Sequence, residues 1–380
     1  MRGTLILLVL CICFSVFYIT DAKEIEIIDV TFENSSGREL SALLCLPDDE
    51  GKHPAIVGCG GWAGSLHQYN NWPKFLAENG YIVLWIEPTF ETSALLSMFG
   101  LSVWPQDIRD AVDWLLDTSP AREIVDKERI GLMGHSLGSI AVTKEAESDS
   151  RIKAVVALST PNPSAMRDLE APLMVISGDL DLSLYEIVGF LRNFLMPCMI
   201  FEPLCLLSLP LLLPISALLN MASLIALPAY YYAEPPKEII VISGGTHNGM
   251  SKIGDAVWPK PYWEIDMCEH YSLAWFDYFL KMDRRAYSYL VEPYGELSLF
   301  YPSLYDLGKG EEVIGGRTTS SLQSSLSSVT SLFFNYLIPC RLYLGFVRSF
   351  FNVLSDADFI SSEISQCLSF YRVYQKYGGI

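Results

Sequence analysis

The stretch Arg129-Ile130-Gly131-Leu132-Met133-Gly134-His135-Ser136-Leu137-Gly138-Ser139 decides the fold of this chain. It combines a short apolar strand, the pattern G-x-S-x-G and a run of small residues that begins a helix, which is the context of a nucleophile elbow. Gly134 and Gly138 are needed because side chains there would collide with the neighbouring strand and helix. Ser136 is left at the apex in a strained conformation and faces a cleft. A surface turn that matches the pattern by chance is the alternative.

Apolar strands separated by helices surround the elbow. The predicted strands are residues 54–62, 81–87, 152–159, 171–178 and 237–243, the last of these being the final strand of the sheet, and helices are predicted from about residue 72, over 104–119 and over 262–281. Continuous apolar strands of this kind predict a mostly parallel sheet with helices on both faces, an α/β fold. Alternating residues 24–32 and 40–47, joined by a turn, predict a β-hairpin before this sheet.

Two acidic residues follow the strand 171–178. Ligand sites in open α/β sheets lie at the carboxyl ends of the strands, so Asp179 and Asp181 are placed at the same edge as Ser136. Asp181 is the preferred catalytic acid because it has left the strand and can reach across to a neighbour. Asp179 is the second choice, and either residue could instead cap a helix.

The strand 237–243 leads into a glycine-rich loop that carries His247. The chain has five histidines, two of which precede the elbow, while His135 lies within it and His270 lies on a predicted helix. His247 is therefore the preferred general base. The chain order is then serine, acid, histidine.

The loop 59–65 follows a buried strand and is rich in glycine. An acyl-transfer site needs backbone N–H groups aimed at the developing oxyanion, and a loop in this position supplies one of them. Trp62 N–H is the first choice and Gly61 N–H the second, while Leu137 N–H is the other donor. A glycine turn needed only for the strand-to-helix geometry is the alternative.

Composition excludes some functions. The net charge of −18 argues against a nucleic-acid partner, because phosphates are bound by clusters of Lys and Arg. Nine cysteines are present without metal-type spacing, so no metal site is inferred, and disulfide pairing cannot be deduced. The hydrophobic content of 51% indicates that some segments face a membrane.

The N-terminus has the pattern of a targeting segment. A basic residue precedes the apolar run 4–20, and small residues follow it. Residues 1–22 are therefore predicted to be a signal peptide or an uncleaved signal anchor. The protein is expected to be exported, extracytoplasmic and associated with a membrane.

These motifs together resemble dienelactone hydrolase-like α/β-hydrolases, and most closely the cutinase-like polyester hydrolase branch. The resemblance covers about residues 24–290 apart from one insertion, and its motifs are residues 134–138, 178–181, 244–247, 274–280 and 283–285. It implies a serine esterase with Ser136, Asp181 and His247 as the triad. No metal or organic cofactor is implied, and the expected substrates are carboxylic esters of apolar or acyl-chain character.

A more distant similarity, to the hydrolase domain of acyl-CoA thioesterases and bile-acid acyltransferases, leaves a thioesterase or an acyltransferase as an alternative. A peptidase of the same fold is another, because the triad sets the chemistry and the pocket sets the leaving group. A membrane-tethered binding protein without catalysis would be a different class. The presence of all three triad residues at strand ends counts against it.

The chain is thus expected to have a hydrolase domain over residues 23–290 that departs from the family pattern in one internal segment. Residues 184–234 form an insertion after the acid strand, and residues 203–233 of it carry no charge. A hydrophobic lid or a membrane-dipping hairpin is the preferred interpretation. A transmembrane or re-entrant hairpin and a plain core insertion are the alternatives.

The C-terminal part is the second departure. Residues 291–331, which include a serine-rich run, are expected to be a linker, and residues 332–380 a helical extension. Residues 332–354 combine many aromatic side chains with two arginines, which suits an interfacial helix. A helix that packs back on the hydrolase body is the alternative.

Overall fold

The structure is a computed structural model, which describes residues 24–62, 64–89, 103–162, 165–181, 220, 222–252, 261–306 and 311–314. All of these residues belong to the unit Met1–Gly315. The predicted signal segment, the serine-rich run and the C-terminal helix lie outside the described residues.

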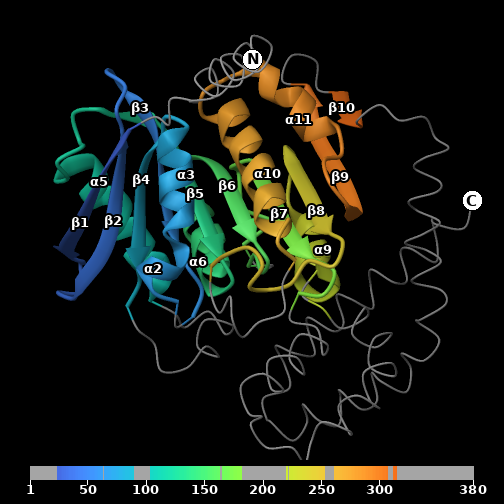
Figure 1. The fold of residues 1–380 in the computed structure, drawn as a ribbon, viewed down its shortest axis with the longest axis horizontal. Helices are drawn as coiled ribbons and strands as arrows, with labels where there is room; N and C mark the ends of the chain where they lie inside the picture. Colours follow the sequence, from blue (N-terminus) through green and yellow to red (C-terminus); the bar gives the residue numbers. More distant parts are fainter. Residues whose placement is uncertain are drawn as a thin grey trace, which may run out of the picture. The chain divides into compact units, whose positions relative to one another are not determined.

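A ten-stranded mixed sheet forms the centre of the described residues, in the order β1-β2-β4-β3-β5-β6-β7-β8-β9-β10 (Figure 1). Its strands are β1 (Ile25–Glu33), β2 (Glu39–Pro47), β3 (His53–Cys59), β4 (Ile82–Glu87), β5 (Val125–His135), β6 (Ile152–Leu158), β7 (Leu173–Gly178), β8 (Lys237–Ile242), β9 (Leu297–Asp306) and β10 (Glu311–Ile314). The central strands from β4 to β8 are parallel to one another. The prediction of a mostly parallel sheet is therefore confirmed, as is the β1–β2 hairpin that precedes it.

Helices cover both faces of this sheet. They are α2 (Leu66–Tyr69), α3 (Asn71–Glu78), α5 (Trp104–Asp117), α6 (Leu137–Ala146), α9 (Leu227–Tyr232), α10 (Glu264–Phe279) and α11 (Tyr287–Val291), with a π-helical turn at Ala222–Ala226 and a 3₁₀ turn at Arg284–Ala286. Helices α5, α6 and α9 pack on one face, and α3 and α10 pack on the other, which is the nearer face in Figure 1. Within the described residues, no helix is both long and apolar enough to cross a membrane.

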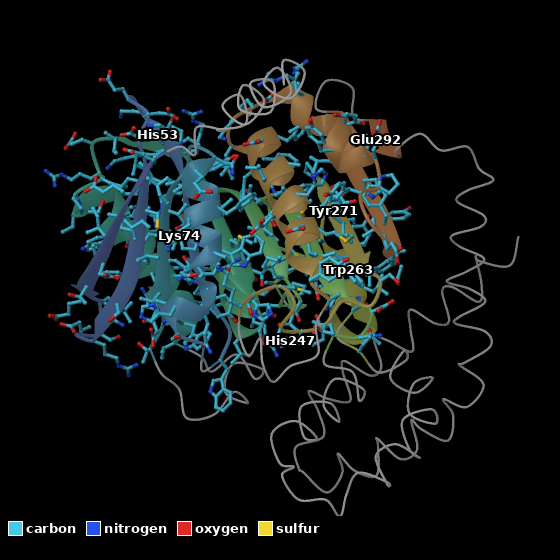
Figure 2. All side chains as sticks on the ribbon, viewed as in Figure 1. His53, Lys74, His247, Trp263, Tyr271 and Glu292 are labelled. Atoms are coloured by element: carbon cyan, nitrogen blue, oxygen red, sulfur yellow. The ribbon has the colours of Figure 1, made fainter. Side chains whose placement is uncertain are left out.

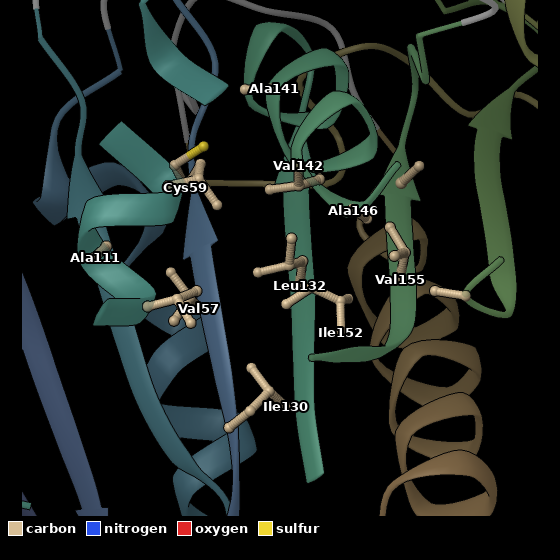
Figure 3. Close-up of a cluster of buried hydrophobic side chains, with 14 of the residues drawn as sticks. Val57, Cys59, Ala111, Ile130, Leu132, Ala141, Val142, Ala146, Ile152 and Val155 are labelled. Carbon is tan, nitrogen blue, oxygen red and sulfur yellow. The ribbon is translucent and has the colours of Figure 1, made fainter. Parts of the chain in front are cut away.

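The core consists of two clusters of buried side chains, one on each face of the sheet. Strand β5 contributes to both, because successive side chains of a strand point to opposite faces. Ile130 and Leu132 lie beside Val57 and Val155 beneath α6 (Figure 3), whereas Met133 belongs to the cluster under α3 and α10. Burial on both faces explains why these strands are continuously apolar in sequence.

The sheet continues beyond the strand that was expected to be its last. β9 pairs antiparallel with β8, and β10 pairs antiparallel with β9. The prediction of a linker over residues 291–331 is therefore wrong for both strands, and the hydrolase domain extends beyond residue 290, to Ile314 among the described residues. Pro302 lies within β9 and weakens the strand pattern, and pairing with a partner far away in sequence leaves no local signal.

The end of the predicted insertion is part of the core. Ala226, Ala229 and Tyr230 are buried in the same cluster as the side chains of β7 and β8, and the Lys237 ammonium lies 4.7 Å from the centre of the Tyr230 ring. The interpretation of the whole segment as a lid or membrane hairpin is therefore wrong for residues 222–233. Short alanine-rich helices that pack against a sheet and apolar lid helices have the same composition, so the sequence did not separate them. Residues 184–219 lie outside the described residues.

Glu238 of β8 is a carboxyl group buried in the core without a hydrogen-bond partner. Its side chain is fully buried, and neither Oε1 nor Oε2 has a partner within the described residues. It shares a face of the sheet with Ile240, two residues along the strand, which packs in the cluster under α10. Burial raises the pKa of Glu238 well above its ordinary value. The folded protein therefore keeps this group protonated under conditions in which the unfolded chain ionises it.

Glu238→Gln is expected to raise the thermal unfolding midpoint at about pH 8 and to change it little at about pH 5. A glutamate in the unfolded chain ionises near pH 4.3, so above that pH the unfolded state binds fewer protons than the folded state. The stability of the wild type then falls as the pH rises, by at most about 1.4 kcal/mol per pH unit for one group. Glutamine keeps the shape of the neutral acid and removes this titration.

Thermal unfolding of both proteins at the two pH values measures this effect. Glu39→Gln, on an exposed position of β2, is the matched control and should show no such pH-dependent gain. A Glu238→Gln midpoint that differs from the wild type equally at both pH values would contradict the assignment of a neutral buried carboxyl group.

Candidate active site

The elbow lies between the end of β5 and the start of α6. Ser136 has φ 56° and ψ −122°, a strained conformation for a residue with a side chain. A Cβ atom on Gly134 would lie 2.3 Å from the carbonyl oxygen of Gly138, and one on Gly138 would lie 2.4 Å from that of Gly60. Both glycines are therefore required by close backbone contacts, as predicted from the sequence.

The structure brings Ser136, His247 and Asp181 into one hydrogen-bonded row. Ser136 Oγ lies 2.8 Å from His247 Nε2, and His247 Nδ1 lies 2.7 Å from Asp181 Oδ1. The three residues follow β5, β8 and β7, whose carboxyl ends meet at one edge of the sheet, where Figure 2 labels His247. Because a carboxylate can only accept, His247 Nδ1 donates to Asp181, and Nε2 is left to accept from the Ser136 hydroxyl. This is the arrangement of a nucleophile, a base and an orienting acid.

Asp181 is kept ionised by several donors although it is fully buried. Ser177 Oγ donates to Asp181 Oδ2 at 2.9 Å, and Ser159 Oγ, which is 3.1 Å from His247 Nδ1, also hydrogen-bonds to this carboxylate. Burial opposes ionisation, but the attraction of His247 and these hydrogen bonds outweigh it and lower the pKa of Asp181 below its ordinary value. The acid therefore holds a negative charge beside the imidazole.

Asp179 has a different role. Its Oδ1 accepts from the backbone N–H of Gly244 at 2.8 Å, and its Oδ2 accepts from the hydroxyl of Ser298 on β9. Asp179 thus ties the start of the His247 loop to the neighbouring strand. Of the two acids considered from the sequence, the structure places only Asp181 against His247.

Glu264, at the first turn of α10, anchors the His247 loop and was missed by sequence analysis. Both of its carboxylate oxygens accept from the Thr246 N–H, at 3.0 and 2.9 Å. Gly249 makes room for it, since a Cβ atom there would lie 1.6 Å from Glu264 Oε2. An acid at the start of a helix is common, because it stabilises the helix dipole, so the sequence alone did not distinguish this residue.

Ser159 was also missed. It follows β6 directly, has φ 78° and is fully buried. A polar residue in a strained conformation, immediately after a buried strand that neighbours the elbow strand, was the available signal. The sequence interpretation instead treated Ser159 as the last residue of that strand.

The loop after β3 lies directly against the nucleophile. A Cβ atom on Gly61 would be 2.8 Å from the Cβ of Ser136, so only glycine allows this approach. The N–H of Gly61 donates to the hydroxyl of Tyr69 at 2.8 Å, which counts against Gly61 as the oxyanion donor. Trp62, whose side chain is 46% exposed, is the next residue of the loop. Leu137 begins α6, where first-turn N–H groups have no acceptor within the helix.

The described cysteines do not form an alternative reactive centre. Cys45, Cys59 and Cys268 are free and buried, and burial raises the pKa of the Cys45 thiol to about 12. Buried neutral thiols of this kind are poor nucleophiles. Within the described part of the chain, no group of three or more His, Cys, Asp or Glu side chains is arranged to hold a metal ion.

A parallel sheet covered on both faces, with a strained serine between strand and helix and a histidine and an acid at the neighbouring strand ends, defines an α/β-hydrolase. Residues 38–185 match the model of the PET hydrolase-like family, which confirms the resemblance to the polyester hydrolase branch over these residues. The protein is thus an ester hydrolase of the α/β-hydrolase fold. The matched region contains Ser136 and Asp181 and ends before His247. No curated protein matches the chain.

Proposed function

We propose that the protein cleaves carboxylic esters through an acyl-enzyme on Ser136. His247 Nε2 takes the proton of the Ser136 hydroxyl as its oxygen attacks the ester carbonyl, and the ionised Asp181 stabilises the imidazolium. The imidazolium then protonates the leaving alcohol. Water repeats the same steps on the acyl-enzyme and releases the acid.

The observation that carries this proposal is the hydrogen-bonded row from Ser136 Oγ through His247 to Asp181, with distances of 2.8 and 2.7 Å. Both distances lie in the range for proton transfer between a nucleophile and its base. The match of the elbow region to the PET hydrolase-like family supports ester substrates.

Oxyanion stabilisation is assigned to the N–H groups of Trp62 and Leu137. Leu137 lies at the N-terminus of α6, where the helix dipole favours a developing negative charge. The commitment of the Gly61 N–H to Tyr69 supports Trp62 as the donor from the loop. The exposed indole of Trp62 lies next to Gly61 in this loop and supports substrates of apolar or acyl-chain character.

Ester hydrolysis and covalent labelling together test the proposal. The purified protein is expected to hydrolyse p-nitrophenyl acetate and butyrate and to react with a fluorophosphonate probe at Ser136, identified by peptide mass spectrometry. Prior reaction with the probe should abolish hydrolysis. Labelling at another serine, or hydrolysis that survives complete labelling of Ser136, would contradict the assignment.

Export and membrane association are also proposed. They are supported by the basic flank and apolar run within residues 1–22 and by the uncharged residues 203–219. Full-length protein should be recovered in the membrane fraction and exposed on the extracytoplasmic side. A variant without residues 1–22 should stay in the cytoplasm. Recovery of both proteins in the same compartment would contradict export through this segment.

A further inference from the structure

Tyr69 and His135 form a buried chain of hydrogen bonds between the loop of Gly61 and the loop of His247. The Gly61 N–H lies 2.8 Å from Tyr69 Oη, Tyr69 Oη lies 2.6 Å from His135 Nδ1, and His135 Nε2 lies 2.7 Å from the carbonyl oxygen of His247. Both side chains are at most 1% exposed. These hydrogen bonds thus connect the two loops that lie on either side of Ser136.

The direction of every hydrogen bond in this chain is determined by its two ends. A carbonyl oxygen only accepts, so His135 Nε2 carries the proton and donates to His247. Neutral His135 must then accept at Nδ1, and the Tyr69 hydroxyl donates to it. The Tyr69 oxygen is left to accept from the Gly61 N–H, and Ser251 provides a further hydrogen bond to it. Only one placement of the protons therefore gives every donor in this row an acceptor.

The ionisation states agree with this arrangement. Burial, and then the proximity of His247, lower the pKa of His135 to about 3, so the ring is neutral at neutral pH. Burial raises the pKa of Tyr69, so its hydroxyl keeps its proton. A neutral chain of this kind contributes fixed dipoles and adds no charge beside the imidazole of His247.

The segment that follows the Gly61 loop and the segment that follows His247 are joined by further contacts. The indole N–H of Trp72 donates to the carbonyl oxygen of Met250 at 2.9 Å, and the Lys252 N–H donates to that of Gln68 at 3.1 Å. Gly60 packs against Tyr69, since a Cβ atom there would lie 2.2 Å from its ring. The residues after the Gly61 loop and those after His247 therefore form one connected seam.

We propose that Tyr69 and His135 are positioning residues that hold the oxyanion loop and the loop of the catalytic base in register on either side of Ser136. This inference rests on the proposed function. Gly61 contacts Ser136 directly, and the next N–H along the chain is that of Trp62, so a shift of Gly61 moves an oxyanion donor. The other end of the chain fixes the backbone of His247 itself. Both side chains are at most 1% exposed, so they act through the two loops, and a misplacement of about 1 Å can lower a rate by about a hundredfold.

Tyr69→Phe tests the proposal by removing one hydroxyl group. It leaves the Gly61 N–H and His135 Nδ1 without their partner, and kcat for ester hydrolysis is expected to fall about 10- to 100-fold while KM changes less than about threefold. Tyr81→Phe is the matched control, because Tyr81 is equally buried and its hydroxyl donates to Asp277 at 2.7 Å in another part of the fold. Tyr81→Phe should lower the melting temperature as well but leave kcat within about twofold.

His135→Asn provides a second variant. Its shorter side chain retains a group near the position of Nδ1 but no longer reaches the carbonyl oxygen of His247. The loss in kcat of His135→Asn should resemble that of Tyr69→Phe. The double variant should be about as active as the less active of the two single variants, because residues of one hydrogen-bond network do not act additively. Losses that multiply in the double variant would contradict a shared role.

Nitrogen-15 NMR of histidine-labelled protein tests the hydrogen bonds of His135 without any activity measurement. The chain has five histidines, and His135→Asn identifies the His135 signals. In the wild type, His135 should be the neutral tautomer with the proton on Nε2. Tyr69→Phe should keep this tautomer, because Nε2 still donates to the His247 carbonyl oxygen, but it should shift the resonance of the unprotonated Nδ1, which loses its donor, whereas Tyr81→Phe should leave that resonance unchanged.

The outcomes separate the two proposals. If the wild type hydrolyses esters and Tyr69→Phe keeps the kcat of Tyr81→Phe, the positioning role is wrong and the proposed function stands. A wild-type His135 that is protonated on Nδ1 also overturns the positioning role. If the wild type neither hydrolyses esters nor labels at Ser136, the proposed function fails, and the tautomer measurement alone decides whether the chain of hydrogen bonds exists.

Discussion

Ser136→Ala is expected to lower kcat for p-nitrophenyl ester hydrolysis by about four to six orders of magnitude, with little change in KM. The variant removes the nucleophile that lies 2.8 Å from His247 Nε2 and leaves the backbone donors of the oxyanion site in place. The variant should therefore still hydrolyse esters about a thousandfold faster than the uncatalysed reaction in water, through substrate binding and oxyanion stabilisation alone. His247→Ala should lose a similar factor, and the double variant should be no worse, because the two residues act as one unit.

Ser272→Ala is the matched control for this measurement. Ser272 on α10 is also fully buried, and its Oγ has no hydrogen-bond partner within the described residues. Removal of its hydroxyl should leave kcat and the melting temperature nearly unchanged. If Ser136→Ala retains more than about a tenth of the wild-type kcat, the serine mechanism is wrong.

Asp181→Asn is expected to lower kcat by about ten-thousandfold while the protein stays folded. Asparagine can present an amide N–H to His247 Nδ1, which stabilises the tautomer that carries its proton on Nε2. That nitrogen then faces the Ser136 hydroxyl as a donor and cannot take its proton. The variant also removes the buried negative charge that stabilises the imidazolium.

Asp179→Asn is the matched comparison, two residues away on the same turn. It retains one oxygen that can accept from the Gly244 N–H, and its amide can donate to Ser298. A loss of a few-fold at most is expected from a slightly loosened His247 loop. The opposite ranking of the two variants would assign the catalytic acid to Asp179.

The pH dependence of the reaction follows from the state of Asp181. Its pKa is lowered from the ordinary value of about 3.9, so it is ionised throughout the range above about pH 5. The stabilisation it gives the folded state is present above the pKa of the unfolded chain and is lost as the pH falls through the lower folded value. Titration of Asp181 should therefore contribute no acid limb to the profile of kcat against pH above about pH 5.

The residues proposed for the catalytic chemistry could be predicted from sequence motifs. Gly134, Ser136 and Gly138 have roles fixed by local geometry, because a tight strand-to-helix turn tolerates no other side chains at the glycines. Asp181 and His247 follow buried apolar strands, and the carboxyl ends of parallel strands meet at one edge. These signals lie in short stretches of the chain, so the amino-acid sequence was enough to find them.

Tertiary structure alone decided how these residues are supported. Ser159, Glu264 and Tyr69 come from distant parts of the chain, and each resembles an ordinary polar or aromatic residue of a strand end, helix start or helix in sequence. Their roles arise from contacts with His247, Thr246 and His135 that exist only once the sheet has formed. The pairing of β9 with β8, and the packing of α9 on the core, are non-local for the same reason. A hydrogen bond or an apolar contact between distant segments has no sequence period, so folding had to bring the partners together before their function could be recognised.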